Sequence, residues 1–330
     1  MNVADLRPAS IGQLLDRAVT LGVKFFVPLA LVYAVFQIPV SLVSFYASAG
    51  MWRSLVQIAE AMQRHASSRE ISQMMAHVSS PSGTLSLMLY AVLIFAMPLA
   101  QGALVAAIGA AYLDRSALTL GDAYRRGFRV WLPLIGVTLV WLAIGALAYL
   151  GLLLAALAVG LVVALVYAAV HALGIALGVI GILLFFVALV AAVSVAYPAV
   201  AYSYFAVVLE NAAFVNAVSS GISRTFGRSF WRSLLTGLAG TAFLTGFSLL
   251  QTLVVGLVSA LFFSVVSIAR HDPAVAVITG SVAAVPIGIA GAIVITAFFE
   301  IAYFDVRVRS EGFDLERAAA ADALAVPGAT

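Results

Sequence analysis

Residues 130–209 read VWLPLIGVTLVWLAIGALAYLGLLLAALAVGLVVALVYAAVHALGIALGVIGILLFFVALVAAVSVAYPAVAYSYFAVVL and contain no Asp, Glu, Lys or Arg. His171 is the one readily ionisable side chain in these 80 residues. A single helix that crosses a hydrocarbon core about 30 Å thick needs about 20 apolar residues. The stretch is therefore too long for one crossing and too apolar for the core of a soluble domain. It predicts an integral membrane protein.

Four further charge-poor stretches have the length of a membrane crossing, at residues 25–52, 85–113, 233–269 and 274–299. The mean hydropathy of the chain is +1.13, with 64% hydrophobic and 9% charged residues. These values and stretches predict an all-α integral membrane protein that crosses the bilayer several times. We expect six crossings, at about 25–49, 85–113, 130–155, 184–209, 233–266 and 275–303.

Residues 156–183 are left over between two of these crossings. They are apolar and would reach roughly 42 Å as a helix, long enough to cross once more. A seventh crossing, however, would place Arg224 on the outer side. The segment is expected either to extend two long helices or to form a re-entrant or interfacial hairpin. We also expect it to be buried at the outer face, in a partner, a second copy of the chain or the outer leaflet.

The distribution of basic residues predicts which side of the membrane each connection faces. Cytoplasmic connections of membrane proteins carry an excess of Lys and Arg. Of the 17 basic residues, four would face outward, namely Arg53, Arg64, Arg69 and Arg270. The others would face the cytoplasm: Arg7, Arg17, Lys24, Arg115, Arg125, Arg126, Arg129, Arg224, Arg228, Arg232, Arg307, Arg309 and Arg317. Both termini are then cytoplasmic, and the number of crossings is even.

The composition also excludes several classes of protein. The longest polar connection, about 53–83, is too short for an independent folded core. The chain has no Cys, which excludes disulfides, thiol catalysis and cysteine metal sites. Its net charge of +3 follows from membrane topology and does not indicate a nucleic-acid partner. No nucleophile–base, metal or nucleotide-binding pattern is present, so we expect no catalytic residue and no cofactor.

A sequence unit recurs along the chain. Its two clearer copies open with a hydroxyl residue, followed by Gly at the second, an acceptor side chain at the third and Arg at the seventh position. These copies begin at Ser10 and Thr119, and a weaker third copy contains Arg224. The units end in similar triplets: Tyr112-Leu113-Asp114, Val208-Leu209-Glu210 and Tyr303-Phe304-Asp305.

Each clear opening predicts a short helix with a capping box, in which Gln13 and Asp122 reach back to Ser10 and Thr119. The apolar side chains of residues 11–22 share one face, as in a helix that lies on the inner leaflet. The repeat therefore predicts a single transmembrane domain of three tandem hairpins, each preceded by a short cytoplasmic interfacial helix. The units are about 10–114, 119–210 and 215–305, with a cytoplasmic tail at 306–330.

Both ends of the chain resemble a family of bacterial multi-pass membrane proteins. Residues 6–17, LRPASIGQLLDR, and 303–315, YFDVRVRSEGFDL, are similar to the two ends of the family named after the membrane domain of glycerophosphoryl diester phosphodiesterases. Residues 112–126 are similar as well. The resemblance implies a six-helix protein of the bacterial inner membrane. It implies no phosphodiesterase activity, because that chemistry would belong to a separate soluble domain.

Six arginines near the membrane form the densest chemical feature of the sequence: Arg125, Arg126, Arg129, Arg224, Arg228 and Arg232. An anionic membrane surface attracts each such residue by about 1 kcal/mol. Topology and anchoring are the simpler interpretation. The alternative is specific binding of membrane lipids at the cytoplasmic face, through the anionic head group of a phospholipid or of a phosphorylated lipid intermediate.

Four polar residues within the apolar stretches are further candidates, because polar groups at membrane depth often serve function. We expect His171 to be neutral and hydrogen-bonded near the outer interface, with a proton-coupled or substrate-binding role as the alternative. Glu300 lies near the cytoplasmic end of the last crossing, where we expect an ion pair with an arginine of an interfacial helix. Gln101 and Gln251 are candidates for hydrogen bonds between helices.

The outer connection holds Glu60, His65, Glu70 and His77. Two His and two carboxylates are a ligand set that zinc accepts. The same residues also fit the solvated faces of short amphipathic helices. We prefer that interpretation and expect no metal site.

Two functions are consistent with these observations, and we prefer the first, because the sequence shows no nucleophile–base, metal or nucleotide-binding pattern. The first is a non-enzymatic scaffold, or the membrane subunit of a larger assembly with a second copy or a partner membrane protein. The second is a transporter, or a protein that binds and handles lipids, which the repeated hairpins and their prolines favour. Kinked helices around a polar cavity would support the second function, and a tightly packed bundle with an apolar flank would support the first.

Overall fold

The computed structural model describes residues 7–65, 67–76, 83–114, 116–227, 230–265, 273–313 and 315, and this part of the chain contains helices and no strand. Its short helices are α1 (Ile11–Lys24), α3 (Ser68–Ala76), α5 (Leu120–Arg129) and α8 (Phe214–Phe226). Its long helices are α2 (Phe26–Gln63), α4 (Gly83–Leu113), α6 (Trp131–Ala169), α7 (His171–Glu210), α9 (Phe230–Val265) and α11 (Pro273–Glu311).

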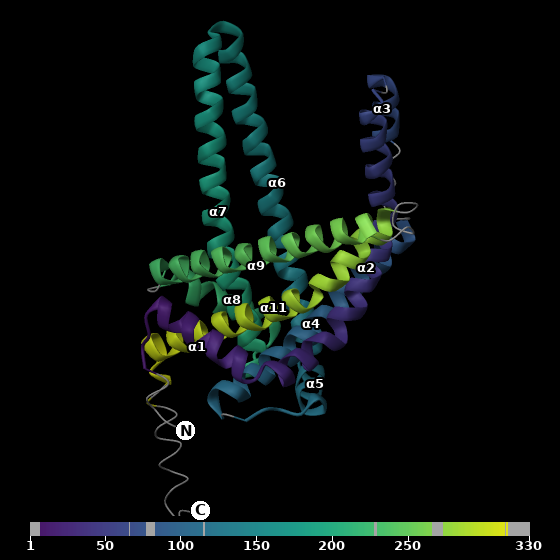
Figure 1. The fold of residues 1–330 in the computed structure, drawn as a ribbon. Coiled ribbons are helices and arrows are strands. Elements are labelled where there is room, and N and C mark those ends of the chain that lie inside the picture. The colour runs from purple at the N-terminus through teal and green to yellow at the C-terminus, as the bar shows by residue number, and fades with distance from the viewer. Residues whose placement is uncertain are drawn as a thin grey trace, which may run out of the picture.

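The six long helices are each long and apolar enough to cross a membrane. This confirms the predicted all-helical class and the predicted number of helices that could cross a membrane, within the described residues. The pairs α2 and α4, α6 and α7, and α9 and α11 are in contact. Figure 1 shows α1 and α5 at the opposite end of the molecule from the turn between α6 and α7.

The short helices α1 and α5 begin with the hydroxyl caps that their sequences predict. Ser10 accepts a hydrogen bond from the Gln13 N–H, and the Gln13 side chain accepts one from the Ser10 N–H, which confirms the capping box. Thr119 accepts from the Asp122 N–H at 3.2 Å, whereas the Asp122 carboxylate accepts from the Thr119 hydroxyl. The weaker third copy has no such cap, since Ala213 stands at the N-cap position of α8.

Residues 156–183 extend α6 and α7 without a break, and a turn at Val170 joins the two helices. They form no re-entrant segment. At about 1.5 Å per residue, helices of 39 and 40 residues reach roughly 60 Å. Figure 1 shows their far ends projecting together, away from the other helices. Near the turn the two helices lie very close, because a Cβ on Gly174 would be 2.4 Å from the Cα of Tyr167.

The buried core lies around α11. This helix contacts α1, α2, α4, α7 and α9, and its aromatic side chains Phe298, Phe299, Tyr303 and Phe304 are almost fully buried. The helices α4, α7 and α11 each contact the other two. Each of these three also contains an interior proline, Pro98, Pro198 and Pro286. They form the frame of the candidate site.

Candidate functional site

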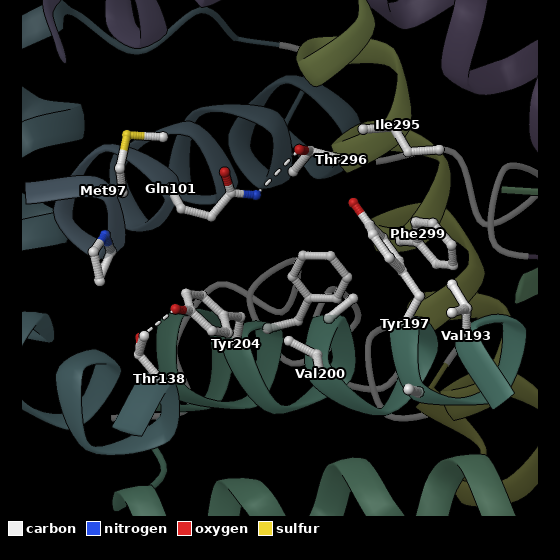
Figure 2. Close-up of a pocket in the computed structure, with 14 residues that line it drawn as sticks. Met97, Gln101, Thr138, Val193, Tyr197, Val200, Tyr204, Ile295, Thr296 and Phe299 are labelled. Atoms are coloured by element: carbon white, nitrogen blue, oxygen red, sulfur yellow. Dashed lines mark hydrogen bonds between the residues drawn. The ribbon is translucent and has the colours of Figure 1, made fainter. Parts of the chain in front are cut away.

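An apolar cavity of roughly 500 Å³ lies between α4, α6, α7 and α11 (Figure 2). Its polar groups are few and mostly paired. The Gln101 side-chain amide donates to the Thr296 hydroxyl at 3.1 Å, and the Thr138 and Tyr204 hydroxyls share a hydrogen bond. The lining residues are Met97, Pro98, Gln101, Thr138, Val193, Ala196, Tyr197, Val200, Ala201, Tyr204, Phe205, Ile295, Thr296 and Phe299.

A smaller cavity of roughly 220 Å³ shares the Gln101–Thr296 pair and extends towards α9. Gln251 lines it and packs against Gly288, where a Cβ would lie 3.2 Å from the Gln251 amide nitrogen. Two of the polar residues singled out from the sequence, Gln101 and Gln251, thus border the same internal space. Gln101 forms the expected hydrogen bond between helices.

A second large cavity, of roughly 470 Å³, lies further along α4, α7 and α11. It is polar, because three arginines and one carboxylate line it: Arg126 and Arg129 from α5, Arg307 from α11 and Asp114 from the end of α4. Its remaining lining residues are Ala106, Gly109, Ala110, Leu113, Val130, Val208, Leu209, Asn211, Phe304 and Phe313. With three positive charges against one negative charge, this basic cavity suits an anion.

The arginines of the basic cavity differ in their bonding. Arg307 pairs with Glu311 at 2.8 Å and with Glu210 at 3.4 Å, and its guanidinium lies over the Phe313 ring. Among the residues that the structure describes, Arg126 and Arg129 have no hydrogen bond or ion pair. Their guanidinium groups are therefore available to a ligand.

The repeated sequence explains why Arg126 has no partner. In the first unit, Arg17 donates to the hydroxyl of Tyr112 at 3.5 Å, and in the third, Arg224 donates to that of Tyr303 at 2.6 Å. Both tyrosines begin the end triplet of their unit. In the middle unit this position is Val208, which has no hydroxyl and lines the basic cavity. The cavity therefore lies where the repeat departs from its pattern.

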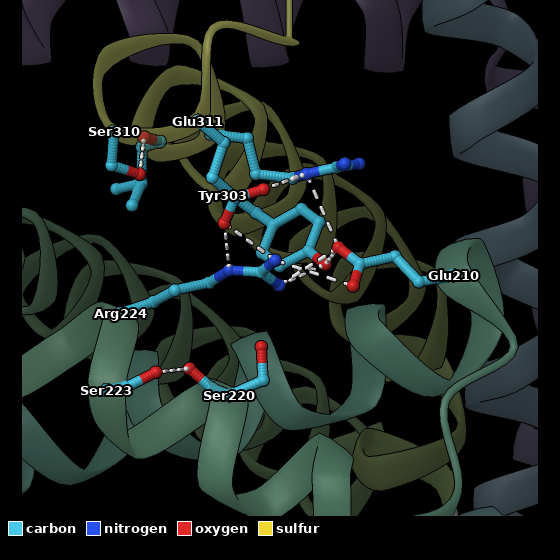
Figure 3. A network of polar contacts seen from close by, with 9 residues as sticks. Glu210, Ser220, Ser223, Arg224, Tyr303, Ser310 and Glu311 are labelled. Atoms are coloured by element: carbon cyan, nitrogen blue, oxygen red, sulfur yellow. Dashed lines mark hydrogen bonds and ion pairs between the residues drawn. The ribbon is translucent and has the colours of Figure 1, made fainter.

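Arg224 joins the ends of α7, α8 and α11 (Figure 3). Its guanidinium pairs with Glu210 at 2.9 Å and with Glu311 at 2.8 Å. The Tyr303 hydroxyl donates in turn to Glu210. Burial alone would lower the pKa of Arg224, but Tyr303 and the two carboxylates outweigh it and raise this pKa above its ordinary value.

Asp305 is the centre of a second ion-pair cluster. Its carboxylate binds Arg232 at 2.6 Å and Arg309 at 2.9 Å, and it accepts the Ala9 N–H at 2.8 Å. Both arginines also donate to the Ala9 carbonyl. This cluster attaches the start of the chain to α9 and α11.

The six arginines predicted to contact lipid head groups are thus placed differently. Arg126 and Arg129 line the basic cavity, whereas Arg224 and Arg232 bind carboxylates of the protein. The Arg125 side chain is 81% exposed and lies 3.8 Å from Asp122. Arg228 lies outside the described residues. Head-group contact by these arginines stays a prediction. Arg126 and Arg129 have the geometry for it, because they line the basic cavity.

Glu300 lies buried between the apolar and the basic cavity. Neither of its carboxyl oxygens has a hydrogen-bond partner among the described residues, so the expected ion pair with an arginine is not found. Its Oε1 packs against Gly109: a Cβ added to Gly109 would lie only 2.9 Å from this oxygen. Gly109 itself lines the basic cavity.

The remaining candidates lie away from these cavities. His171 begins α7 at the exposed turn of the α6–α7 hairpin, with its ring 4.6 Å from that of Tyr167. His65 and Glu70 are exposed near α3. His77 and the side chain of Glu60 lie outside the described residues, so the alternative zinc site is not described.

Three residues of the site were not singled out from the sequence, namely Val208, Arg307 and Asp114. A signal for Val208 was present, because the end triplets differ at this position. Arg307 and Asp114 follow or end such triplets, but only the packed helices show that they border one cavity with Arg126.

Comparison of the chain with protein-family models, with curated proteins and with solved structures found no match. The functional interpretation therefore depends on the geometry of the two cavities and on the membrane-spanning helices.

Proposed function

We propose that the chain is a bacterial inner-membrane protein of three tandem hairpins, with both termini in the cytoplasm and α1, α5 and α8 as interfacial helices. The distribution of basic residues supports this orientation. The order of one short helix before each contacting pair of long helices supports the hairpins. Membership of the family that the two chain ends resemble is part of the same proposal.

Reporter fusions test this orientation. Fusions at residues 122, 220 and 330 should report a cytoplasmic location, and fusions at residues 70 and 271 an external one. Each hairpin returns the chain to the side on which it started, so residues 122 and 220 must agree. An external signal at residue 220 would mean an odd number of crossings between Arg129 and Arg224, and the three-hairpin arrangement would be wrong.

The function that the geometry supports best is binding and handling of an anionic lipid. A basic cavity and an apolar cavity lie in succession along α4, α7 and α11. An amphiphile has the same division, with a charged head group and a hydrocarbon chain. This succession is the observation that carries the proposal.

The sizes and chemistry of the cavities agree with such a ligand. Small-molecule sites usually have volumes of about 300–1,000 Å³ and a few polar groups that fix orientation. The basic cavity offers two guanidinium groups that no described residue occupies, and guanidinium binds phosphate through paired, charge-assisted hydrogen bonds. The helices α4, α7 and α11 along these cavities each contain an interior proline, a residue that permits a kink.

The substitution Val208→Tyr tests this function by restoring the pattern of the other two units. The new hydroxyl should accept a hydrogen bond from Arg126, and the ring should fill part of the basic cavity. We expect the amount of anionic phospholipid that co-purifies in mild detergent to fall by about tenfold or more, since a hydrogen bond to a charged group contributes about 1.5–3 kcal/mol. Native mass spectrometry measures it.

Val208→Ile is the matched control, because it adds one carbon and no hydroxyl and should retain lipid within about twofold. Arg126→Gln with Arg129→Gln should reproduce the loss without filling the cavity. Equal retention of lipid by the wild type, Val208→Tyr and the double variant would refute head-group binding at this cavity.

A scaffold function is the second candidate, and one observation favours it. The far parts of α6 and α7 contact little beyond each other and expose many apolar side chains, among them Leu161, Leu165 and Ile182. A flank of this kind suits a partner membrane protein as well as lipid tails. A scaffold that uses the α6–α7 flank should keep its partners in the Val208→Tyr variant, whereas a lipid-binding function should not survive it.

A further inference from the structure

Glu300 occupies the boundary between the two cavities. On the same helix, Thr296 and Phe299 line the apolar cavity, whereas Phe304 and Arg307 line the basic one. Glu300 lies about one helical turn from Thr296 on one side and from Phe304 on the other. Its carboxyl group is fully buried against Gly109, and Gly109 lines the basic cavity.

The surroundings of this carboxyl group make its charge costly. An ionised carboxylate in an apolar interior needs hydrogen bonds or a countercharge, and otherwise takes up a proton. Neither Glu300 oxygen has a partner within the described structure. The ionisable groups on the elements around it include Asp114 after α4, Arg126 and Arg129 on α5, Tyr202 and Glu210 on α7, and Tyr303 and Arg307 on α11.

Three of those groups are already engaged with other residues. Glu210 and Tyr303 bind Arg224, and Arg307 binds Glu311. The positive groups that remain available to an ionised Glu300 are therefore Arg126 and Arg129, across the basic cavity. An anionic head group in that cavity would compete with Glu300 for the same two guanidinium groups.

We propose that Glu300 is a proton-binding site linked to occupation of the basic cavity. The carboxylate takes one proton from water when an anionic head group enters, and it releases this proton when the head group leaves. This proposal rests on the lipid-binding function proposed above and identifies a proton as the ion coupled to lipid binding. Linkage between the two sites is reciprocal, so the proton strengthens lipid binding as much as the lipid strengthens proton binding.

The sign of the pH dependence follows from this exchange. At acidic pH Glu300 already carries its proton, and the lipid binds without further cost. At higher pH Glu300 must take up one proton from water each time a lipid binds. The affinity for the lipid then falls by up to about tenfold per pH unit. Lipid binding should therefore be tightest on the acidic side and weaken as the pH rises through the titration of Glu300.

Binding of phosphatidylglycerol to the purified full chain tests the proposal between pH 5 and pH 9. Its phosphodiester carries one charge over this range, so the ligand itself does not titrate. We expect the affinity of the wild type to fall by about tenfold or more, and that of Glu300→Gln to change by less than about twofold, because the amide cannot ionise. Glu70→Gln, which removes an exposed carboxylate on α3, should keep the wild-type pH profile.

The outcomes separate the two proposals. Equal pH profiles for the wild type and Glu300→Gln, or a flat profile for the wild type, would refute the proton site while leaving lipid binding intact. No binding to either protein at any pH would refute the lipid-binding function itself. If Glu300→Gln does not fold, infrared difference spectra of the wild type decide the matter: lipid addition at alkaline pH must produce a carboxylic acid C=O band.

Discussion

Replacing Asp305 by Ala should destabilise the folded protein by about 3–5 kcal/mol, the usual effect of removing one partner from a buried ion pair. The Asp305 side chain is only 3% exposed, and it binds Arg232 and Arg309 as well as the Ala9 N–H. The variant leaves Arg232, Arg309 and the Ala9 N–H without the carboxylate that they bind. The start of the chain should then detach from α11.

Thermal unfolding in mild detergent measures the effect. At about 2–4 °C per kcal/mol, the unfolding midpoint of the Asp305→Ala variant should fall by at least about 6 °C. Asp16→Ala is the matched control, because Asp16 is exposed on α1 and its removal should change stability by no more than about 0.5 kcal/mol. Equal midpoints for the two variants would show that the Asp305 cluster contributes no stability.

The helices could be predicted from the sequence because their causes are local. The charge-poor runs predict six membrane-crossing helices, and the described part of the chain has six helices long and apolar enough to cross. The capping box at Ser10 depends on residues only three apart, and it forms as predicted. Residues 156–183 allowed two conformations at this level, since apolar composition alone does not separate a continued helix from a re-entrant one. Only the structure shows that α6 and α7 continue.

The long-range ion pairs could not be predicted, because they join residues far apart in the chain. Asp305 binds the Ala9 N–H across 296 positions, and Arg224 binds Glu311 across 87. Glu300 and Asp305 are five residues apart, and only Arg309, four residues after Asp305, is a partner that the sequence could indicate. The approach of Arg232 to Asp305 across 73 positions is visible only in the structure. Asp305 binds both arginines, whereas Glu300 binds none among the described residues.

The basic cavity shows a different limit of the sequence. The similarity of the end triplets was visible, but its consequence depends on where the first residue of each triplet points. Tyr112 and Tyr303 meet the repeated arginines of their own units, so the missing hydroxyl of Val208 matters to Arg126. A difference between repeats becomes informative once the structure shows which contact the repeat preserves.

The second large effect is expected at the crossing of α9 over α7, in the variant Gly237→Ala. Pro198 has no N–H, so the carbonyl of Ser194, four residues earlier, lacks its helical hydrogen bond. A Cβ on Gly237 would lie 1.6 Å from the Ser194 carbonyl oxygen. Glycine fits because its Cα carries a hydrogen in place of the Cβ. Such Cα–H contacts to a carbonyl oxygen recur between closely packed helices.

A methyl group at Gly237 cannot be accommodated by a side-chain movement, because the obstacle is the backbone of α7. The two helices would have to separate, which should destabilise the protein by about 3 kcal/mol or more, the upper part of the range for overpacking. Gly246→Ala on the same helix is the matched control, since nothing lies within 4 Å of its Cβ position. There alanine should stabilise α9 by up to about 1 kcal/mol through its higher helix propensity. Unfolding midpoints that fall for Gly237→Ala and hold or rise for Gly246→Ala would establish the close crossing, because propensity alone would raise both.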